Sequence, residues 1–159
     1  MTADIGLGLS VVATGLWSGL LLTLTTILHP MFAARGPAGF TEDMHRFLPV
    51  ARHSPTNYVL VVALVASPVV ALVGLWRQPG SAPFVLTAVG LAATVAGPLL
   101  MSIRLAEPNY AVILSWDPDA VPQDWGVARA RYFRFNWLRA ALTWTALGLF
   151  VTAAYLHFT

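Results

Sequence analysis

The sequence predicts an all-α integral membrane protein, a single four-helix bundle (1-159) with two short interfacial helical segments at one end. Hydrophobic residues make up 57% of the chain and charged residues only 10%, whereas about a quarter of an ordinary soluble domain is charged. The mean hydropathy is +0.70. Four apolar stretches reach the roughly 20 residues that a helix needs to cross the hydrocarbon core of a bilayer. Little of the chain remains outside these stretches.

The first predicted span covers residues 5–28. Pro30 is expected to end it, because proline lacks the N–H that continues the helical hydrogen bonding. The first residues lack the basic stretch of a signal peptide, so this span should remain in the mature protein. The next stretch, 33–54, is too polar to cross the bilayer. Within it Thr41, followed by two acidic residues, predicts the start of a short helix.

The second and third spans are predicted at 55–76 and 84–105. Ser54 has the character of an N-cap residue and is followed by a proline, the arrangement that begins many helices. Pro68 and Pro98 lie inside these two spans and are expected to kink them. The glycine- and proline-rich stretch between the spans predicts a tight turn.

Residues 107–125 are expected to return to the interface. Pro108 predicts the start of a short helix, and the breakers that follow predict a turn. A long helix should then run from about residue 122 to 155. Its first part is amphipathic and lies outside the membrane, and its second part, 134–155, is the fourth span.

The charges predict an orientation in the cell membrane. All nine basic residues are arginines, and the formal net charge of +2 is too small to indicate a nucleic-acid partner. Arg77 stands alone on one side. The other side carries Arg35, Arg46, Arg52, Arg104, Arg129, Arg131, Arg134 and Arg139. By the positive-inside rule both termini should lie outside and the two large loops in the cytoplasm. The absence of cysteine excludes dithiol and iron–sulfur chemistry.

Four residues of the last helix form a polar stripe. Tyr132, Asn136, Arg139 and Thr143 are spaced by four, three and four residues, so they share one helical face. An arginine about one turn inside the membrane is costly unless it snorkels to phosphates, pairs, or faces a wet cavity. The Asn136 amide and the Tyr132 phenol are aligned with Arg139 and favour an inward-facing polar pocket. The alternative is that Arg139 snorkels to lipid phosphates.

Three histidines lie near the same membrane face. An imidazole can act as a base or as a metal ligand, because it titrates near neutral pH. His29, His45 and His53 are separated by sixteen and eight residues, which matches no local metal-ligand motif. We expect at least two of them to point to the space above Arg139; the alternative is that they are ordinary interfacial residues. His53 and Asn57 would share one face if the second helix began early.

Three segments resemble a known family. These are "HPMF" at the end of the first span, "EPNYAVILSWDPDA", and "DWGVARARYFRFNWLRAALTW" at the start of the last span. Together they are similar, over nearly the whole chain, to the anthrone oxygenase-like family of small four-span membrane proteins, many of them bacterial and without known function. The matching positions are Trp116, Asp117, Pro118, Trp125, Asn136 and Arg139. The family's Asn-x-Pro-x-Asn element appears here only in part, around Pro108 and Asn109, and Tyr132 stands where a tryptophan is common.

The resemblance implies a membrane-embedded monooxygenase that oxidises a hydrophobic, activated aromatic substrate, such as an anthrone, with O2. This chemistry does not require a cofactor, because the doubly benzylic CH2 is acidic and its enolate is electron-rich enough to reduce O2. His45 or His53 would be the base, with Arg139, Asn136 and Tyr132 around the oxyanion. The residues expected to contact the substrate are His29, Asn57, Glu107, Asn109 and Trp116. Glu107 would pair with Arg139 or Arg104, or simply occupy the first turn of a helix.

Two other functions remain open. The first is a membrane redox protein whose metal or haem is ligated by some of His29, His45 and His53. The second is a non-enzymatic binding or accessory subunit in which the polar stripe serves helix packing. The expected partners are the lipid bilayer and a hydrophobic small molecule, and a homo-oligomer is compatible with this interpretation. A small multidrug exporter is disfavoured, because the first span lacks the membrane-embedded acid that proton coupling needs.

Overall fold

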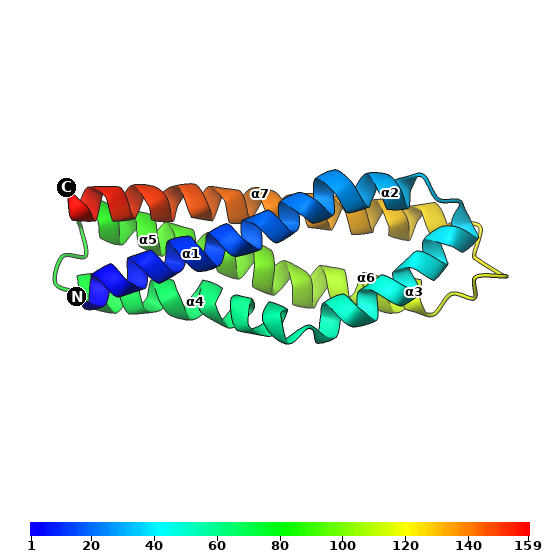
Figure 1. Ribbon diagram of the computed structural model, residues 1–159, viewed down its shortest axis with the longest axis horizontal. Helices are drawn as coiled ribbons and strands as arrows, with labels where there is room; N and C mark the ends of the chain where they lie inside the picture. The colour runs from blue at the N-terminus through cyan, green and yellow to red at the C-terminus, as the bar shows by residue number, and fades with distance from the viewer.

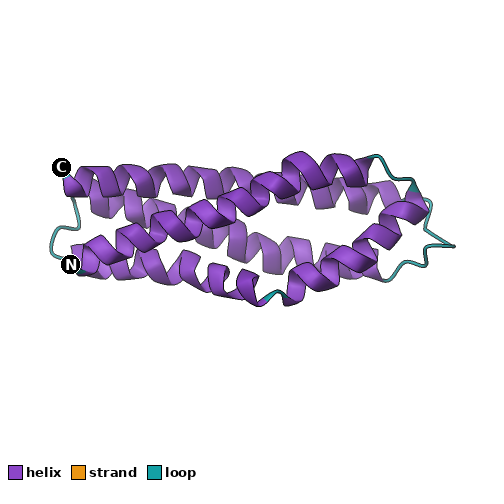
Figure 2. Cartoon of the chain, in the orientation of Figure 1, coloured by secondary structure: helices purple, strands orange, loops and turns teal.

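The computed structural model describes residues 1–159 as four long helical rods and one connecting helix (Figures 1 and 2). No strand is present. The elements, in chain order, are α1 (Thr2–Thr23), η1 (Leu24–Leu28), α2 (His29–Ala33), α3 (Pro37–His53), α4 (Pro55–Leu75), α5 (Ala82–Thr94), η2 (Val95–Ala106), α6 (Glu107–Leu114) and α7 (Trp125–Phe158). All four rods are long and apolar enough to cross a membrane. The predicted all-α four-helix bundle is therefore confirmed.

The two chain termini lie together at one end of the bundle, beside the turn 76–81 (Figure 1). The connecting helix α3 and the loop 115–124 lie at the other end, which we call the α3 end. All arginines except Arg77 belong to the α3 end or to the helix segments that approach it. The distribution of charge along the bundle is therefore strongly asymmetric.

The first rod continues through Pro30 and ends at Ala33, which corrects the prediction that the proline stops it. The segment η1 is a π-helical turn, in which the His29 N–H donates to the Leu24 carbonyl, five residues back. This shift in bonding register lies directly before the proline. The rod thus passes through Pro30 without ending, although a proline normally breaks a helix.

The third rod also contains a proline and a π-helical segment. Pro98 lies inside the π-helical segment η2, and the Glu107 N–H donates to the Ser102 carbonyl, so α6 follows without a break. The predicted separate interfacial helix near Pro108 is therefore the end of the third rod, which is a correction. Only α3 is a separate interfacial helix.

The break between α3 and α4 falls at Ser54, as predicted. The Ser54 Oγ accepts the Asn57 N–H at 3.4 Å, as an N-cap does. The Asn57 Nδ2 donates to the Ala51 carbonyl at 2.9 Å, so this side chain also closes the end of α3. His53 and Asn57 therefore belong to different helices and do not share a face. At its other end α3 begins at Pro37, earlier than the predicted start at Thr41.

Small residues allow α1 and α4 to approach closely near the termini. A Cβ atom on Gly6 would overlap the backbone of Ala71, and one on Gly74 would overlap that of Ala3. Such close approach strengthens the van der Waals packing that contributes to helix association in lipid. At the α3 end the two rods have separated (Figure 1), and α3 contacts both α2 and α6 there.

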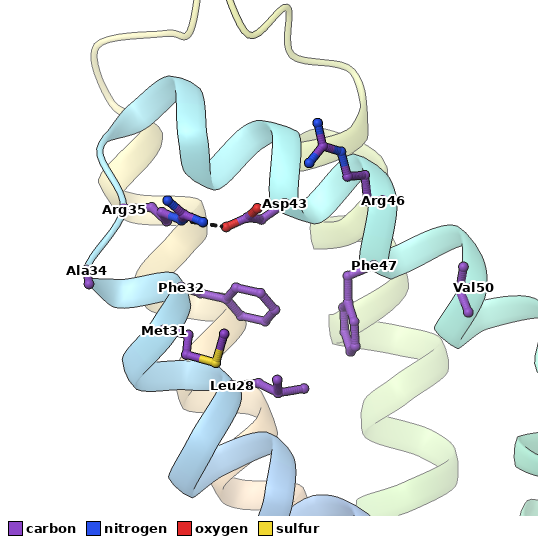
Figure 3. A pocket seen from close by; sticks show the side chains of 9 residues that line it. All are labelled: Leu28, Met31, Phe32, Ala34, Arg35, Asp43, Arg46, Phe47 and Val50. Atoms are coloured by element: carbon purple, nitrogen blue, oxygen red, sulfur yellow. Dashed lines mark hydrogen bonds and ion pairs between the residues drawn. The ribbon is translucent and has the colours of Figure 1, made fainter.

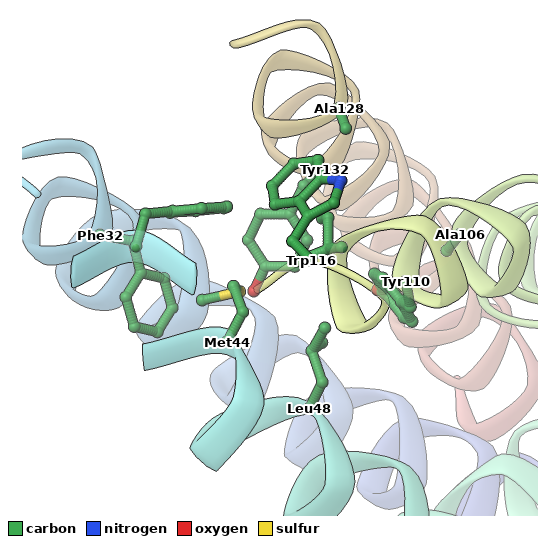
Figure 4. Close-up of a cluster of buried hydrophobic side chains, with 10 residues drawn as sticks. Phe32, Met44, Leu48, Ala106, Tyr110, Trp116, Ala128 and Tyr132 are labelled. Carbon is green, nitrogen blue, oxygen red and sulfur yellow. The ribbon is translucent and has the colours of Figure 1, made fainter. Parts of the chain in front are cut away.

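Under α3 lies a core of bulky side chains (Figure 4). Residues of α2 and α3 pack there against residues of η2, α6, α7 and the loop 115–124. The ten members are Phe32, Phe40, Met44, Leu48, Ala106, Tyr110, Ile113, Trp116, Ala128 and Tyr132. The Asn109 Nδ2 also donates to the Ala128 carbonyl at 3.0 Å, which ties α6 to α7. This core fixes the first turns of α7 above the polar stripe.

Candidate functional site

The guanidinium of Arg139 is held inside the bundle by two polar side chains. Its Nη1 donates to the Ser102 Oγ at 2.8 Å, and its Nη2 donates to the Asn136 Oδ1. The Ser102 hydroxyl in turn donates to the Pro98 carbonyl at 2.6 Å. Arg139 therefore points inward to η2, in agreement with the inward-facing stripe. It makes no ion pair with a carboxylate.

Asn136 connects this arginine to His29. Because a guanidinium can only donate, the amide oxygen of Asn136 must face Arg139, and its Nδ2 then donates to the His29 Nε2 at 3.2 Å. The Nε2 atom is thus an acceptor, and the neutral ring carries its proton on Nδ1. That Nδ1 is buried and has no partner. The ring packs against Phe133 and Tyr132, with centroid distances of 4.7 and 5.5 Å.

A cavity of about 350 Å³ lies beside Arg139, and we call it the inner cavity. Its wall is mainly apolar and is built by α1, α3, α4, η2, α6 and α7. Ser102, Tyr110, Tyr132 and Arg139 supply polar groups to this wall. A mostly apolar cavity of this size with a few convergent polar groups is typical of a small-molecule site.

Three side chains of the inner cavity's wall carry buried hydrogen-bond donors without a partner. They are the Nε1 of Trp17, the hydroxyl of Tyr132 and the Nε of Arg139. Indole and guanidinium nitrogens can only donate, so an acceptor is what these groups lack. Unpaired polar groups are costly where no water competes. Three donors on side chains of the cavity wall are therefore left unsatisfied within the protein.

The one carboxylate near the inner cavity is already paired. The Glu107 Oε2 lies 2.7 Å from the Arg52 Nη2, which joins α6 to the last turn of α3 at the cavity's edge. Of the two sequence-based alternatives for Glu107, pairing with Arg139 or Arg104 is wrong, whereas its place in the first turn of a helix is confirmed, because it begins α6. Because Glu107 is satisfied elsewhere, the positive charge of Arg139 remains free to face an anionic or strongly polar oxygen.

The structure does not bring the three histidines together. His29 is buried in the Arg139 network, whereas His53 is exposed and its Nδ1 contacts the Pro49 carbonyl of its own helix at 2.8 Å. His45 is half-buried and does not line the inner cavity; its Nε2 has no partner. The expectation that at least two imidazoles point to the space above Arg139 is therefore not met. No group of three His, Cys, Asp or Glu side chains is placed to hold a metal ion.

The other expected substrate contacts have mainly structural surroundings. Asn57 lines the inner cavity, but its amide N–H is used at the end of α3. Asn109 bonds to the backbone of α7, and Trp116 is part of the core under α3. Sequence reasoning missed Trp17 and Ser102. The available signal was an indole and a hydroxyl within two mainly apolar predicted spans.

The arrangement can bind a hydrophobic molecule and stabilise negative charge on one of its oxygens, because a fixed guanidinium in an apolar wall is weakly screened. His29 is neutral, and the Asn136 side chain connects it to the Arg139 guanidinium by hydrogen bonds. Among known proteins, no family model, no curated protein and no solved structure matches this chain.

Proposed function

We propose that the protein is a membrane-embedded monooxygenase that binds a hydrophobic aromatic ketone, of the anthrone type, in the inner cavity and oxidises it with O2. The observation that carries the proposal is the unpaired charge of Arg139 in the wall of a mainly apolar cavity of about 350 Å³. The unpartnered donors of Trp17 and Tyr132 support a ligand with more than one acceptor oxygen. The choice of oxidation rests on the family resemblance of residues 29–32 and of the segments around Trp116 and Arg139.

The proposed reaction converts a CH2 group between two aromatic rings into a carbonyl. Loss of one proton gives an enolate, whose negative oxygen would lie near Arg139 and the Tyr132 hydroxyl. The enolate carbon then bonds to O2, the O–O bond breaks, and the second C–H proton is lost. One oxygen atom remains as the new carbonyl and the other leaves as water. The substrate supplies all four electrons, so no external reductant is needed.

We assign the first proton to His29 instead of His45 or His53. None of the three histidines lines the inner cavity, but only His29 is joined to the Arg139 network, through its Nε2 lone pair. In this proposal Asn136 turns its amide to the ligand and frees that lone pair.

A binding protein without catalysis is the second candidate. It is favoured by the fact that no imidazole lines the inner cavity and that its one carboxylate, Glu107, is paired with Arg52.

In either case we propose that the α3 end faces the cytoplasm and that both termini lie outside, because eight of the nine arginines belong to that end.

The proposal is tested on purified protein in lipid nanodiscs with two probes. Binding of 1,8-dihydroxyanthraquinone, a coloured and stable diketone, is followed by absorbance, and anthrone-dependent O2 uptake is followed with an electrode. Arg139→Gln should abolish both signals. The matched control is Arg134→Gln, which removes an exposed arginine from the same helix and should leave both signals unchanged. Binding without O2 uptake would support the second candidate, and no binding would refute both.

A further inference from the structure

Three cavities meet at Phe47 on α3. Besides the inner cavity, a cavity of about 470 Å³ lies between α1 and the α3–α4 junction, and we call it the outer cavity. A third, of about 610 Å³, lies between α2 and α3 and is shown in Figure 3. Phe47 lines all three. The side chains shared by the inner and outer cavities are Leu20, Leu24, Phe47, Ala51 and Asn57.

The wall of the outer cavity includes exposed side chains of the first rod and of α3. Leu20 and Val50 at its rim are 39% and 73% exposed, and Thr23 beside them is also exposed. Leu20 and Thr23 belong to an apolar rod that is long enough to span the membrane. The break at Ser54 lies in the cavity's wall, so α3 and α4 do not form one straight rod against α1 here.

The cavity between α2 and α3 is chemically different. Arg35, Asp43 and Arg46 line it, and the Arg35 Nε donates to the Asp43 Oδ2 at 2.9 Å, so an ion pair joins the chain after α2 to α3 (Figure 3). No charged side chain lines the outer cavity. An apolar molecule therefore meets charged groups along one path and none along the other.

We propose that the ligand enters the inner cavity sideways from the bilayer, through the outer cavity, and that the Phe47 ring is the gate between the two. The occupant of the outer cavity is thus the same lipid-soluble ligand in transit. The inference rests on the proposed binding function, because a lateral route serves only a molecule that is dissolved in the membrane. It is supported by the continuity of the two cavity walls and by the uncharged lining. Each cavity falls in the range of about 300–1,000 Å³ that is usual for small-molecule sites.

The absence of cysteine makes a clean test available. Thr23 lines the outer cavity but not the inner one, so Thr23→Cys places a single thiol at the mouth of the route. The folded variant in nanodiscs is treated with a bulky methanethiosulfonate reagent, which a reductant later removes. Association of 1,8-dihydroxyanthraquinone is then measured by stopped-flow absorbance before modification, after it, and after reduction. The matched control is Thr152→Cys, since Thr152 is also exposed, also bonds to its own helix, and lines none of the three cavities.

The modified Thr23→Cys protein should bind the probe at least about fivefold more slowly and release it correspondingly more slowly, with Kd unchanged within about twofold. Reduction should restore the rate, and the modified control should behave as wild type. Phe47→Ala should speed association. An unchanged association rate after modification of Thr23→Cys would overturn the lateral route while leaving the proposed function intact. If wild-type protein does not bind the probe at all, the proposed function fails, and the route is withdrawn with it. Unchanged or slower association in Phe47→Ala would remove Phe47 as the gate.

Discussion

Replacing Asn136 by leucine tests whether one amide holds His29 and Arg139 together. Asn136 is 1% exposed, and its two amide atoms bond to the Arg139 Nη2 and the His29 Nε2. Leucine has a similar volume but leaves one buried donor and one buried acceptor without partners. Each such group costs roughly 1–3 kcal/mol. Hydrogen bonds in membrane bundles average only about 0.6 kcal/mol, so we expect the lower part of that range, a total loss of roughly 2–4 kcal/mol in the free energy of unfolding.

The assay is reversible unfolding in mixed micelles with increasing SDS, followed by circular dichroism. Combining Asn136→Leu with His29→Leu removes both partners of one bond, so the two changes should be non-additive by about 0.6–1.7 kcal/mol. The control pair is Asn136→Leu with His157→Leu. His157 contacts Asp4 at the other end of the bundle, so these two changes should add within about 0.5 kcal/mol.

Additive behaviour of Asn136→Leu and His29→Leu would refute the network. A cost below about 0.5 kcal/mol for Asn136→Leu alone would have the same meaning, because surface changes fall in that range. Asn136 would then face lipid or headgroups, and the inward stripe would be wrong.

Three further predictions follow from the same structure. Arg139→Lys keeps the charge but removes the planar fork of the guanidinium, which can donate to Ser102 and to a ligand at the same time. A titration should therefore show about tenfold weaker binding of 1,8-dihydroxyanthraquinone. Equal affinity would indicate that a point charge suffices. Gly6→Val should destabilise the fold by about 2 kcal/mol or more, because a Cβ at this position would overlap Ala71. Gly8→Val should be neutral in the same unfolding assay, because nothing lies within 4 Å of a Cβ at that position. Equal effects would contradict the close α1–α4 contact. A reporter that works only in the cytoplasm should be inactive when fused to the C-terminus, and an active fusion would reverse the proposed orientation.

The fold class could be predicted from the sequence because lipid exposure demands apolar surface on every spanning helix. The rods keep that character, with exposed side chains such as Ile5, Leu9, Val12 and Leu16 along one side of α1. The helix ends were less predictable. Pro30 and Pro108 are ordinary stop or start signals in single-sequence reasoning, but the π-helical segments η1 and η2 accommodate such residues within long rods. That shift in register depends on packing between rods and leaves no mark in a short sequence window.

The site was predictable where one helix supplies it. The spacing of Tyr132, Asn136 and Arg139 places them on one face, and the structure has that face turned inward. The partners from other rods were not predictable, because contacts such as those of Asn136 with His29 and of Arg139 with Ser102 depend on how the rods align. For the same reason proximity to one membrane face was a poor guide to which histidine joins the network.

The most direct test of the central claim is a high-resolution structure of the protein in nanodiscs with 1,8-dihydroxyanthraquinone. We predict density for the probe in the inner cavity, with one of its oxygens within about 3 Å of the Arg139 guanidinium, the usual hydrogen-bond distance. A second oxygen should lie near Trp17 or Tyr132. Density for the probe elsewhere, or an Arg139 side chain that leaves Ser102 and Asn136 to reach a lipid phosphate, would contradict the claim.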